Sequence, residues 1–145
     1  QKKNLVVNVG LQELLSVTLD QGSVSAQWYL SVINGFGATP TIAATDTLGT
    51  HAGWTDGTAQ VDARKVYSGT TGPAAVSGNS ITNSGTPVVF TAGATFQVGG
   101  VFLTDQLTGT VGKLFSARGI DGASQPTVNS PDTINATYTI NITSS

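Results

Sequence analysis

The segment Thr133-Ile-Asn-Ala-Thr-Tyr-Thr-Ile-Asn-Ile-Thr143 decides the fold class, because apolar and polar residues alternate along its length. Every second position from Ile134 to Ile142 is apolar, and the positions between them hold Asn and Thr. A strand places successive side chains on opposite faces of a sheet, so this pattern predicts a strand with one buried face and one solvated face. Half-buried strands are typical of antiparallel sheets.

A second segment, Thr95-Phe-Gln-Val-Gly-Gly-Val-Phe-Leu-Thr104, has the composition of a strand but not an unbroken alternation. The interruption falls at Gly99-Gly100, and glycine inside a strand often marks a bulge or a sharp bend. We therefore expect a bulge or bend at these glycines, where one strand serves two sheets.

Further short runs of β-forming residues recur between turn signals such as Asn34-Gly35, with a loop expected over residues 69–78. Their spacing is typical of antiparallel sandwiches and barrels. We predict a mainly β protein built as an antiparallel β-sandwich, of which a jelly roll would be one form. The further strand candidates are Trp28–Ile33, Arg64–Tyr67, Ser80–Asn83, Pro87–Ala92 and Lys113–Ala117.

One helix is expected near the N-terminus, within residues 8–20. The leucines at 11, 14, 15 and 19 are spaced by three and four positions, the stripe of an amphipathic helix, and Gly22 is a plausible stop signal. A chain of 145 residues has the size of one ordinary domain. We therefore expect a single domain over residues 1–145, in which residues 1–22 form an arm and this helix.

The amino-acid composition argues against some classes of binding partner. Six basic residues against eight acidic ones argue against a nucleic-acid partner, which requires clustered Lys and Arg. No apolar run approaches the roughly 20 residues of a membrane span, so no membrane partner is expected. Because the sequence contains no cysteine, packing or assembly must provide stability without disulfides.

The stretch Thr50-His-Ala-Gly-Trp-Thr-Asp56 holds the residues that most resemble a reactive site, including the one histidine. His51 with Asp46 or Asp56 and a nearby serine would form a catalytic triad, but the Gly-x-Ser-x-Gly signature of a strained nucleophile turn does not occur. Asp46, His51, Asp56 and Asp62 lack the close spacing of known metal sites. We predict no catalytic residue, no metal site and no cofactor.

A structural corner explains the same stretch better. Asp46 would cap a short helix over residues 47–52, Gly53 would end that helix, and Trp54 would turn into the core. The His51 imidazole would then satisfy backbone groups of the corner or face a neighbouring subunit.

Four segments carry a resemblance that runs in order from about residue 8 to the last strand. They are Trp28-Tyr-Leu-Ser-Val-Ile-Asn34, Ala43-Ala-Thr-Asp-Thr-Leu-Gly-Thr-His-Ala-Gly-Trp54, Ser80-Ile-Thr-Asn83 and Gly109-Thr-Val-Gly-Lys-Leu-Phe-Ser-Ala117. Together they resemble a family of small tailed-bacteriophage virion proteins, several of which are capsid decoration, or cement, proteins. The chain departs from that pattern at Ser31, where a glycine is usual, and over residues 57–67, where more aromatic residues are usual.

The resemblance implies a structural virion protein on the outer capsid surface that binds assembled major capsid protein. The alternative is a tail or head-fibre component that contacts the host surface. Residues 1–9, with Lys2, Lys3, Asn4 and Leu5 foremost, and the loop at residues 69–78 are the expected capsid contacts. Local threefold axes of icosahedral shells favour a homotrimer. The phenylalanines at 36, 102 and 115 are either subunit contacts or part of each subunit's own core.

Overall fold

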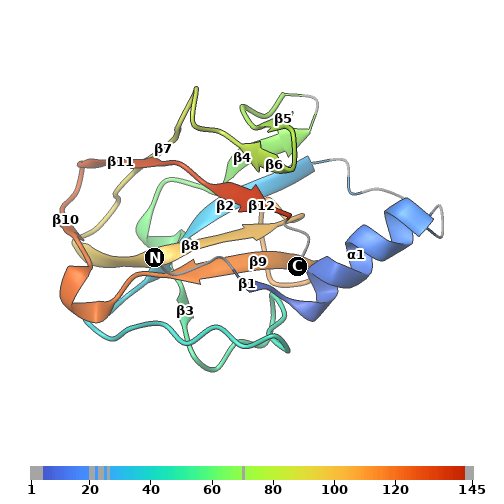
Figure 1. Cartoon of the computed structure of the whole chain (residues 1–145). Coiled ribbons are helices and arrows are strands. Elements are labelled where there is room, and N and C mark those ends of the chain that lie inside the picture. The colour runs from blue at the N-terminus through green and yellow to red at the C-terminus, as the bar shows by residue number, and fades with distance from the viewer. Residues whose placement is uncertain (1–4, 20–21, 23–24, 26, 70, 143–145) are drawn as a thin grey trace.

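The computed structural model describes residues 5–19, 22, 25, 27–69 and 71–142, and within them the chain is mainly antiparallel β with one α-helix near the N-terminus (Figure 1). The helices are α1 (Asn8–Leu19) and the short 3-10 turns η1 (Thr58–Gln60) and η2 (Gly122–Ser124). The strands are β1 (Leu5–Val6), β2 (Gln27–Asn34), β3 (Thr55–Asp56), β4 (Lys65–Gly69), β5 (Ala75–Ser77), β6 (Ser80–Thr82), β7 (Val88–Thr91), β8 (Phe96–Thr104), β9 (Leu114–Gly119), β10 (Thr127–Val128), β11 (Thr133–Ala136) and β12 (Thr139–Asn141).

The larger layer is a seven-stranded sheet in the order β1-β9-β8-β2-β3, with β4 also paired to β2 and β10 to β8. β2 and β8 form its centre and pair antiparallel from Tyr29 opposite Thr104 to Asn34 opposite Val98. The β-branched and aromatic residues of β2 favour this extended conformation. Its last five residues, 30–34, are all buried, because both faces of the sheet are covered.

β8 contains the expected bulge. Ile33 pairs with Gly100 and Asn34 with Val98, which leaves Gly99 as the extra residue. Gly100 adopts φ 151°, a conformation that L side chains rarely reach. On the other edge β8 pairs with β9 from Gly100 onward and with β10 at Phe96 and Gln97. The predicted bulge is confirmed, whereas the expectation that β8 serves two sheets is wrong, because β9 and β10 belong to the same sheet.

The smaller layer contains the pair β11-β7 and the three strands β12-β6-β5. Of the strand predicted over 133–143, Thr143 lies outside the described residues, and the rest forms two short strands rather than one, with Asn83 at the break. The fully buried Asn83 side chain accepts the Tyr138 N–H at 2.7 Å and donates to the Ala136 carbonyl at 2.9 Å. The alternation still holds across the break, since Ala136, Tyr138 and Ile140 are all buried.

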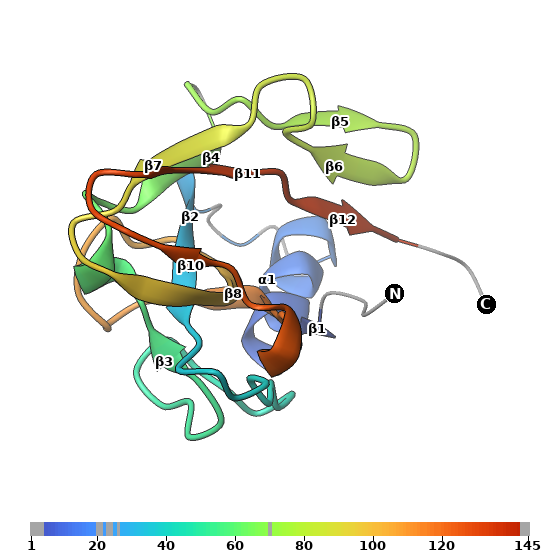
Figure 2. The ribbon, with the colours of Figure 1, turned by 90° about the vertical axis from the view of Figure 1, so that its left-hand side faces the viewer.

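Two apolar clusters lie on opposite faces of the large sheet. The first fills the space between the two layers and includes Leu30, Phe90 and Tyr138. The second includes Leu48, Trp54 and Phe102, and the connection formed by residues 35–56 covers it. Figure 2 shows the strands of the smaller layer above the large sheet and this connection below it. The protein is thus sandwich-like, with an irregular segment covering the outer face of one sheet.

α1 occupies the expected position but does not bury the predicted leucine stripe. Gly10 lies against the Phe115 carbonyl, where a Cβ would have no room, and Leu14 packs on the first cluster. The side chains of Leu11, Leu15 and Leu19 are 46, 57 and 78% exposed, so only Leu14 of the four faces inward. Among the described residues, no helix has the length and apolar character needed to span a membrane.

Two further expectations are corrected by the strand arrangement. Residues 69–78 are not a continuous loop, because β4 extends to Gly69 and β5 occupies Ala75–Ser77 and pairs with β6. The sheets of seven, two and three strands also differ from the two four-stranded sheets of a jelly roll.

Candidate functional site

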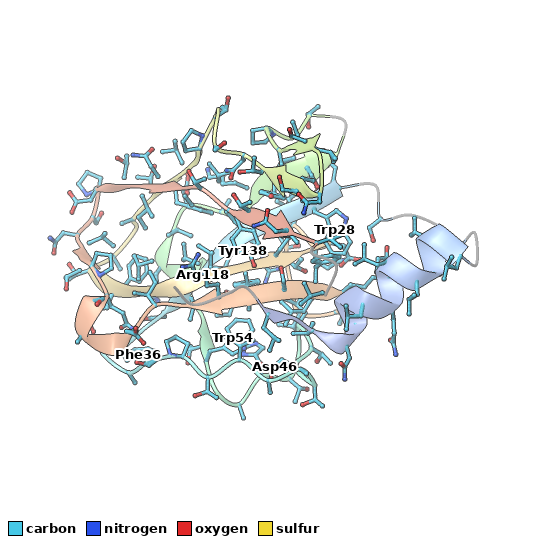
Figure 3. All side chains as sticks on the ribbon, in the orientation of Figure 1. Trp28, Phe36, Asp46, Trp54, Arg118 and Tyr138 are labelled. Atoms are coloured by element: carbon cyan, nitrogen blue, oxygen red, sulfur yellow. The ribbon has the colours of Figure 1, made fainter. Side chains whose placement is uncertain are left out.

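The corner around Asp46 is held by one carboxylate oxygen. Oδ2 of Asp46 accepts the Trp54 indole N–H at 2.9 Å and the Ala43 backbone N–H at 3.0 Å. These bonds fix Trp54, which lies beside Asp46 in Figure 3, in the second apolar cluster. Its ring lies 5.2 Å from that of Phe102. The structure therefore brings Asp46 and Trp54 together in a buried corner.

His51 and Gly53 belong to the same corner. The imidazole stacks on the Trp54 ring at a centroid distance of 3.7 Å, and its Nδ1 lies 3.0 Å from the Trp54 carbonyl oxygen. Gly53 lies against the Thr41 carbonyl, where a Cβ would clash. Its own carbonyl accepts the Thr41 N–H at 2.9 Å. The four residues that the sequence grouped thus meet in space.

The short helix predicted over residues 47–52 does not form. Thr47 and Thr50 exchange backbone hydrogen bonds across a two-residue turn, and the Thr47 hydroxyl also accepts the Thr50 N–H. This tight turn inserts the fully buried Leu48 into the second cluster. Burial of Leu48 therefore outweighs the helical tendency of the segment.

The polar contacts of this corner differ from those of a catalytic triad. A triad requires the carboxylate to accept from the histidine, whereas Asp46 accepts from Trp54 and Ala43. Across the described part of the chain, no group of three or more His, Asp or Glu side chains lies close enough to hold a metal ion. The contacts of this corner instead attach the connection of residues 35–56 to the large sheet.

A buried ion pair, which the sequence reasoning did not single out, lies on the same side of the sheet. Arg64 is 4% exposed, and its guanidinium lies 2.9 Å from Asp56 and 5.5 Å from the Phe102 ring centre. It also donates to the Gln106 carbonyl at 3.1 Å and to the Thr58 hydroxyl at 3.3 Å. These partners satisfy the buried charge and tie η1 to the loop after β8.

The predicted capsid contacts are only partly within the described residues. Lys2, Lys3 and Asn4 lie outside them. Leu5 lies in β1 at the edge of the large sheet, where it pairs with Ala117 and is partly exposed.

Three of the four leucines that the amphipathic spacing predicts on the buried face of α1 are exposed instead. Leu11, Leu15 and Leu19 are spaced by four residues, so they share one face of the helix, which we call the leucine row. In Figure 1, α1 projects from the β layers at one end of the molecule. Gly10, Leu14 and Val17 have a similar spacing and lie toward the sheet. The spacing of residues shows which of them share a face of the helix, but it does not show whether that face points to the core or to solvent.

α1 is held rigidly on the sheet by polar contacts as well. Lys113 of the segment before β9 pairs with Glu13, and Glu13 also accepts from the Ser25 hydroxyl at 3.1 Å. Burial alone would raise the pKa of Glu13, but the hydrogen bonds from Lys113 and Ser25 outweigh it and leave that pKa below its ordinary value. The carboxylate is therefore charged at neutral pH and fixes the helix in place.

Comparison with protein-family models and with curated proteins gives no match for this chain.

Proposed function

We propose that this protein is a capsid decoration protein that binds the assembled major capsid protein on the outer surface of a tailed-phage virion. The observation that carries the proposal is the leucine row on α1. A row of exposed leucines is costly to leave in water, and exposed apolar side chains gathered on one face of a helix mark a place where a partner binds. The resemblance in the four sequence segments supplies the kind of partner.

The attachment of α1 suits such a contact. Close approach at Gly10 and the Glu13–Lys113 pair hold the helix in one orientation before any partner arrives. A preorganised surface loses little conformational entropy on binding. A decoration protein engages several capsid subunits at once, so modest contacts of this kind add up to stable attachment.

The test replaces the leucine row without weakening the helix. Glutamine retains helix propensity, so Leu11→Gln/Leu15→Gln/Leu19→Gln leaves α1 folded while removing its apolar surface. The control, Leu107→Gln/Val111→Gln, removes two exposed apolar side chains outside α1 and outside residues 69–78. Each protein is mixed with purified shells of the phage that encodes it, and co-sedimentation measures occupancy. We expect the triple variant to lose binding and the control to bind like the wild type.

Equal occupancy of the triple variant and the wild type would exclude the leucine row as the contact. Purified virions that lack the protein would overturn the proposed function itself. Virions that carry it only on the tail, together with binding to host cells, would replace it with the tail or fibre role.

A further inference from the structure

The exposed face of α1 carries no charge of its own. Within Asn8–Leu19 the one charged residue is Glu13, and its carboxylate is paired with Lys113 of the same chain. Among the side chains of this helix that the structure describes, the exposed ones outside the leucine row are the neutral amides Asn8 and Gln12. The face of α1 that a partner meets therefore consists of apolar and neutral polar side chains.

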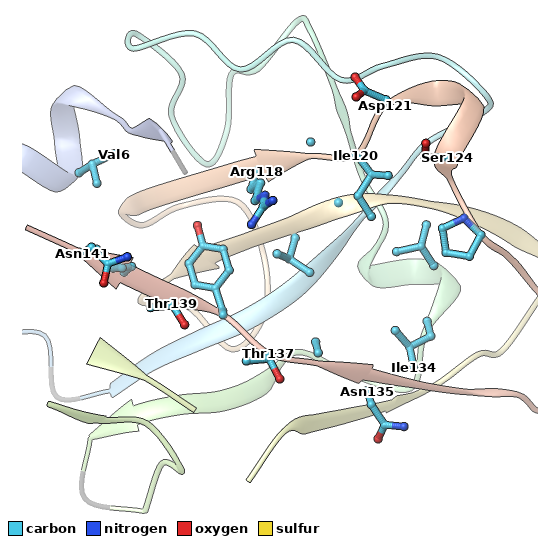
Figure 4. Close-up of a pocket in the computed structure, with 18 residues that line it drawn as sticks. Val6, Arg118, Ile120, Asp121, Ser124, Ile134, Asn135, Thr137, Thr139 and Asn141 are labelled. Carbon is cyan, nitrogen blue, oxygen red and sulfur yellow. The ribbon is translucent and has the colours of Figure 1, made fainter. Parts of the chain in front are cut away.

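Basic side chains elsewhere in the described ranges do not add a free charge to this face. Arg64, Lys65 and Lys113 each form an ion pair with a carboxylate of the chain. Arg118, the fourth described basic residue, lines a cleft of about 950 Å³ between the two layers, and Figure 4 shows its side chain directed into that cleft. Charge complementarity therefore favours a partner surface for α1 that is itself uncharged.

The leucine row is small for an interface that stands alone. Its three residues are 46, 57 and 78% exposed, so together they present less surface than two fully exposed leucines. A stable protein–protein interface buries about 800 Å² on each partner, which is far more than this row supplies. Two copies of the chain that met only through their leucine rows would not form a stable dimer. The row instead suits a contact that is repeated over several subunits of a shell.

The spacing of the row suits a groove on that partner. Residues four positions apart form a ridge along one side of a helix, and such ridges pack into apolar grooves. Leu11, Leu15 and Leu19 form a ridge of this kind. In Figure 1 the helix stands out from the β layers, so the ridge is presented at one end of the molecule.

We infer that the leucine row docks into an apolar groove of the major capsid protein that no charged side chain lines. This inference rests on the proposed function and adds the chemistry of the partner surface. Removal of apolar side chains from water drives such a contact, so it requires no ion pair. Because no opposite charges meet across it, salt has no attraction to screen.

The first test places a charge beside the row without removing a leucine. Gln12→Glu and Gln12→Lys both keep a good helix former at an exposed position, and urea denaturation checks that each variant folds like the wild type. A charge buried without a partner is costly whatever its sign. We therefore expect each variant to bind purified shells about tenfold more weakly, or worse, in the co-sedimentation assay.

The matched controls are Thr133→Glu and Thr133→Lys. Thr133 is exposed at the start of β11, which lies toward the opposite end of the molecule from α1 in Figure 1. Both controls add the same charges outside the proposed contact and should bind like the wild type. A salt series is the second test, because raising NaCl from about 0.05 M to about 1 M screens ion pairs at a surface. We expect the Kd of the wild type to stay within about threefold over this range. Sodium sulfate should tighten binding, because it strengthens the burial of apolar surface.

The outcomes separate this inference from the proposed function. A wild type that binds no shells at any salt concentration overturns the proposed function and the inference with it. A wild type that binds shells but loses more than the expected affinity at high salt overturns the inference alone. The same holds if either Gln12 variant binds as tightly as the wild type or more tightly. In that case the groove carries the opposite charge, or the leucine row lies outside the contact.

Discussion

Asp46 shows how one atom fixes a corner. Its Oδ2 is the acceptor for both Trp54 and Ala43, so removing it leaves two donors unsatisfied at a buried site. We predict that Asp46→Ala lowers the free energy of unfolding by about 2–3 kcal/mol. Asp46→Asn keeps an oxygen acceptor without the charge and should lose about half as much. Urea denaturation followed by Trp fluorescence measures both. Equal losses in the two variants would mean that the charge, and not the acceptor, holds the corner.

The residues of this corner were predictable, but their local geometry was not. The grouping of Asp46, His51, Gly53 and Trp54 followed from the sequence, because reactive-looking residues without a catalytic signature usually serve structure. The short helix was wrong because burial of Leu48 is a tertiary effect, which local propensity does not contain.

Ser31 contacts the segment 57–67 through buried polar groups. Its fully buried hydroxyl lies 2.7 Å from the Thr58 hydroxyl, and Thr58 also receives a bond from Arg64. Ser31 and the segment 57–67 thus belong to one polar network.

At the scale of elements, the bulge in β8 depends on Gly100. A Cβ at this residue would clash with the Arg118 carbonyl, and its φ of 151° is strained for any other residue. We predict that Gly100→Ala lowers the free energy of unfolding by at least about 2 kcal/mol. Gly85→Ala is the matched control, because a Cβ there meets no atom within 4 Å. It should stay within about 1 kcal/mol of the wild type.

Chemical denaturation measures the free energy of unfolding of both variants, and the curves are fitted with one shared m-value. Similar stability of the two alanine variants would show that β8 does not require the bulge seen at Gly100.

The attachment of α1 should depend on pH. The pKa of Glu13 lies below its ordinary value near 4.5, so its contribution is complete above about pH 4.5 and is lost as the pH falls through the lowered pKa. We predict that Glu13→Gln is less stable than the wild type at pH 7 and that the gap narrows on acidification. Urea denaturation between pH 7 and pH 3 measures this. A gap that stays constant over that range would contradict the pairing with Lys113.

The strands were largely predictable, whereas their partners were not. Runs of β-forming residues located eight strands, β2, β4, β6, β7, β8, β9, β11 and β12, but missed the short strands β1, β3, β5 and β10. The break between β11 and β12 depends on Asn83, which is 53 residues from Ala136 in sequence. The same limit explains the helix, where the spacing identified α1 but could not show that Leu14 alone of the four leucines faces inward.

At the scale of the whole molecule, an exposed aromatic residue lies far from α1. Phe36 is 71% exposed at φ 49°, a conformation that bulky residues avoid, whereas Phe102 and Phe115 are buried in the subunit's own core. Phe36 lies at the opposite end of the molecule from α1 (Figure 3). We propose that three Phe36 side chains meet at the axis of a homotrimer, which directs the three leucine rows outward to different capsid subunits.

Phe36→Asn tests this arrangement, because Asn accepts a positive φ and Asn-Gly is favoured where two positive φ values follow one another, as at residues 36 and 37. We predict that the variant is at least as stable as the wild type as a subunit but no longer trimeric. Native mass spectrometry measures the assembly, and thermal unfolding at low concentration measures the subunit. A wild type that is monomeric in solution, or a variant that stays trimeric, would contradict the proposal.

The pairing of the last described segment with both β7 and β6 also limits when, during synthesis, the smaller layer can fold. β7 pairs with β11, and β6 pairs with β12 as well as with β5, so both depend on residues 133–141, which the ribosome makes after nearly all of the remaining described chain. Until then, Phe90 and Ile81 lack their cross-strand neighbours Ile134 and Ile140. The smaller layer therefore cannot be completed before this late, long-range closure. A chain truncated before residue 133 would be a target for proteases rather than a smaller working protein.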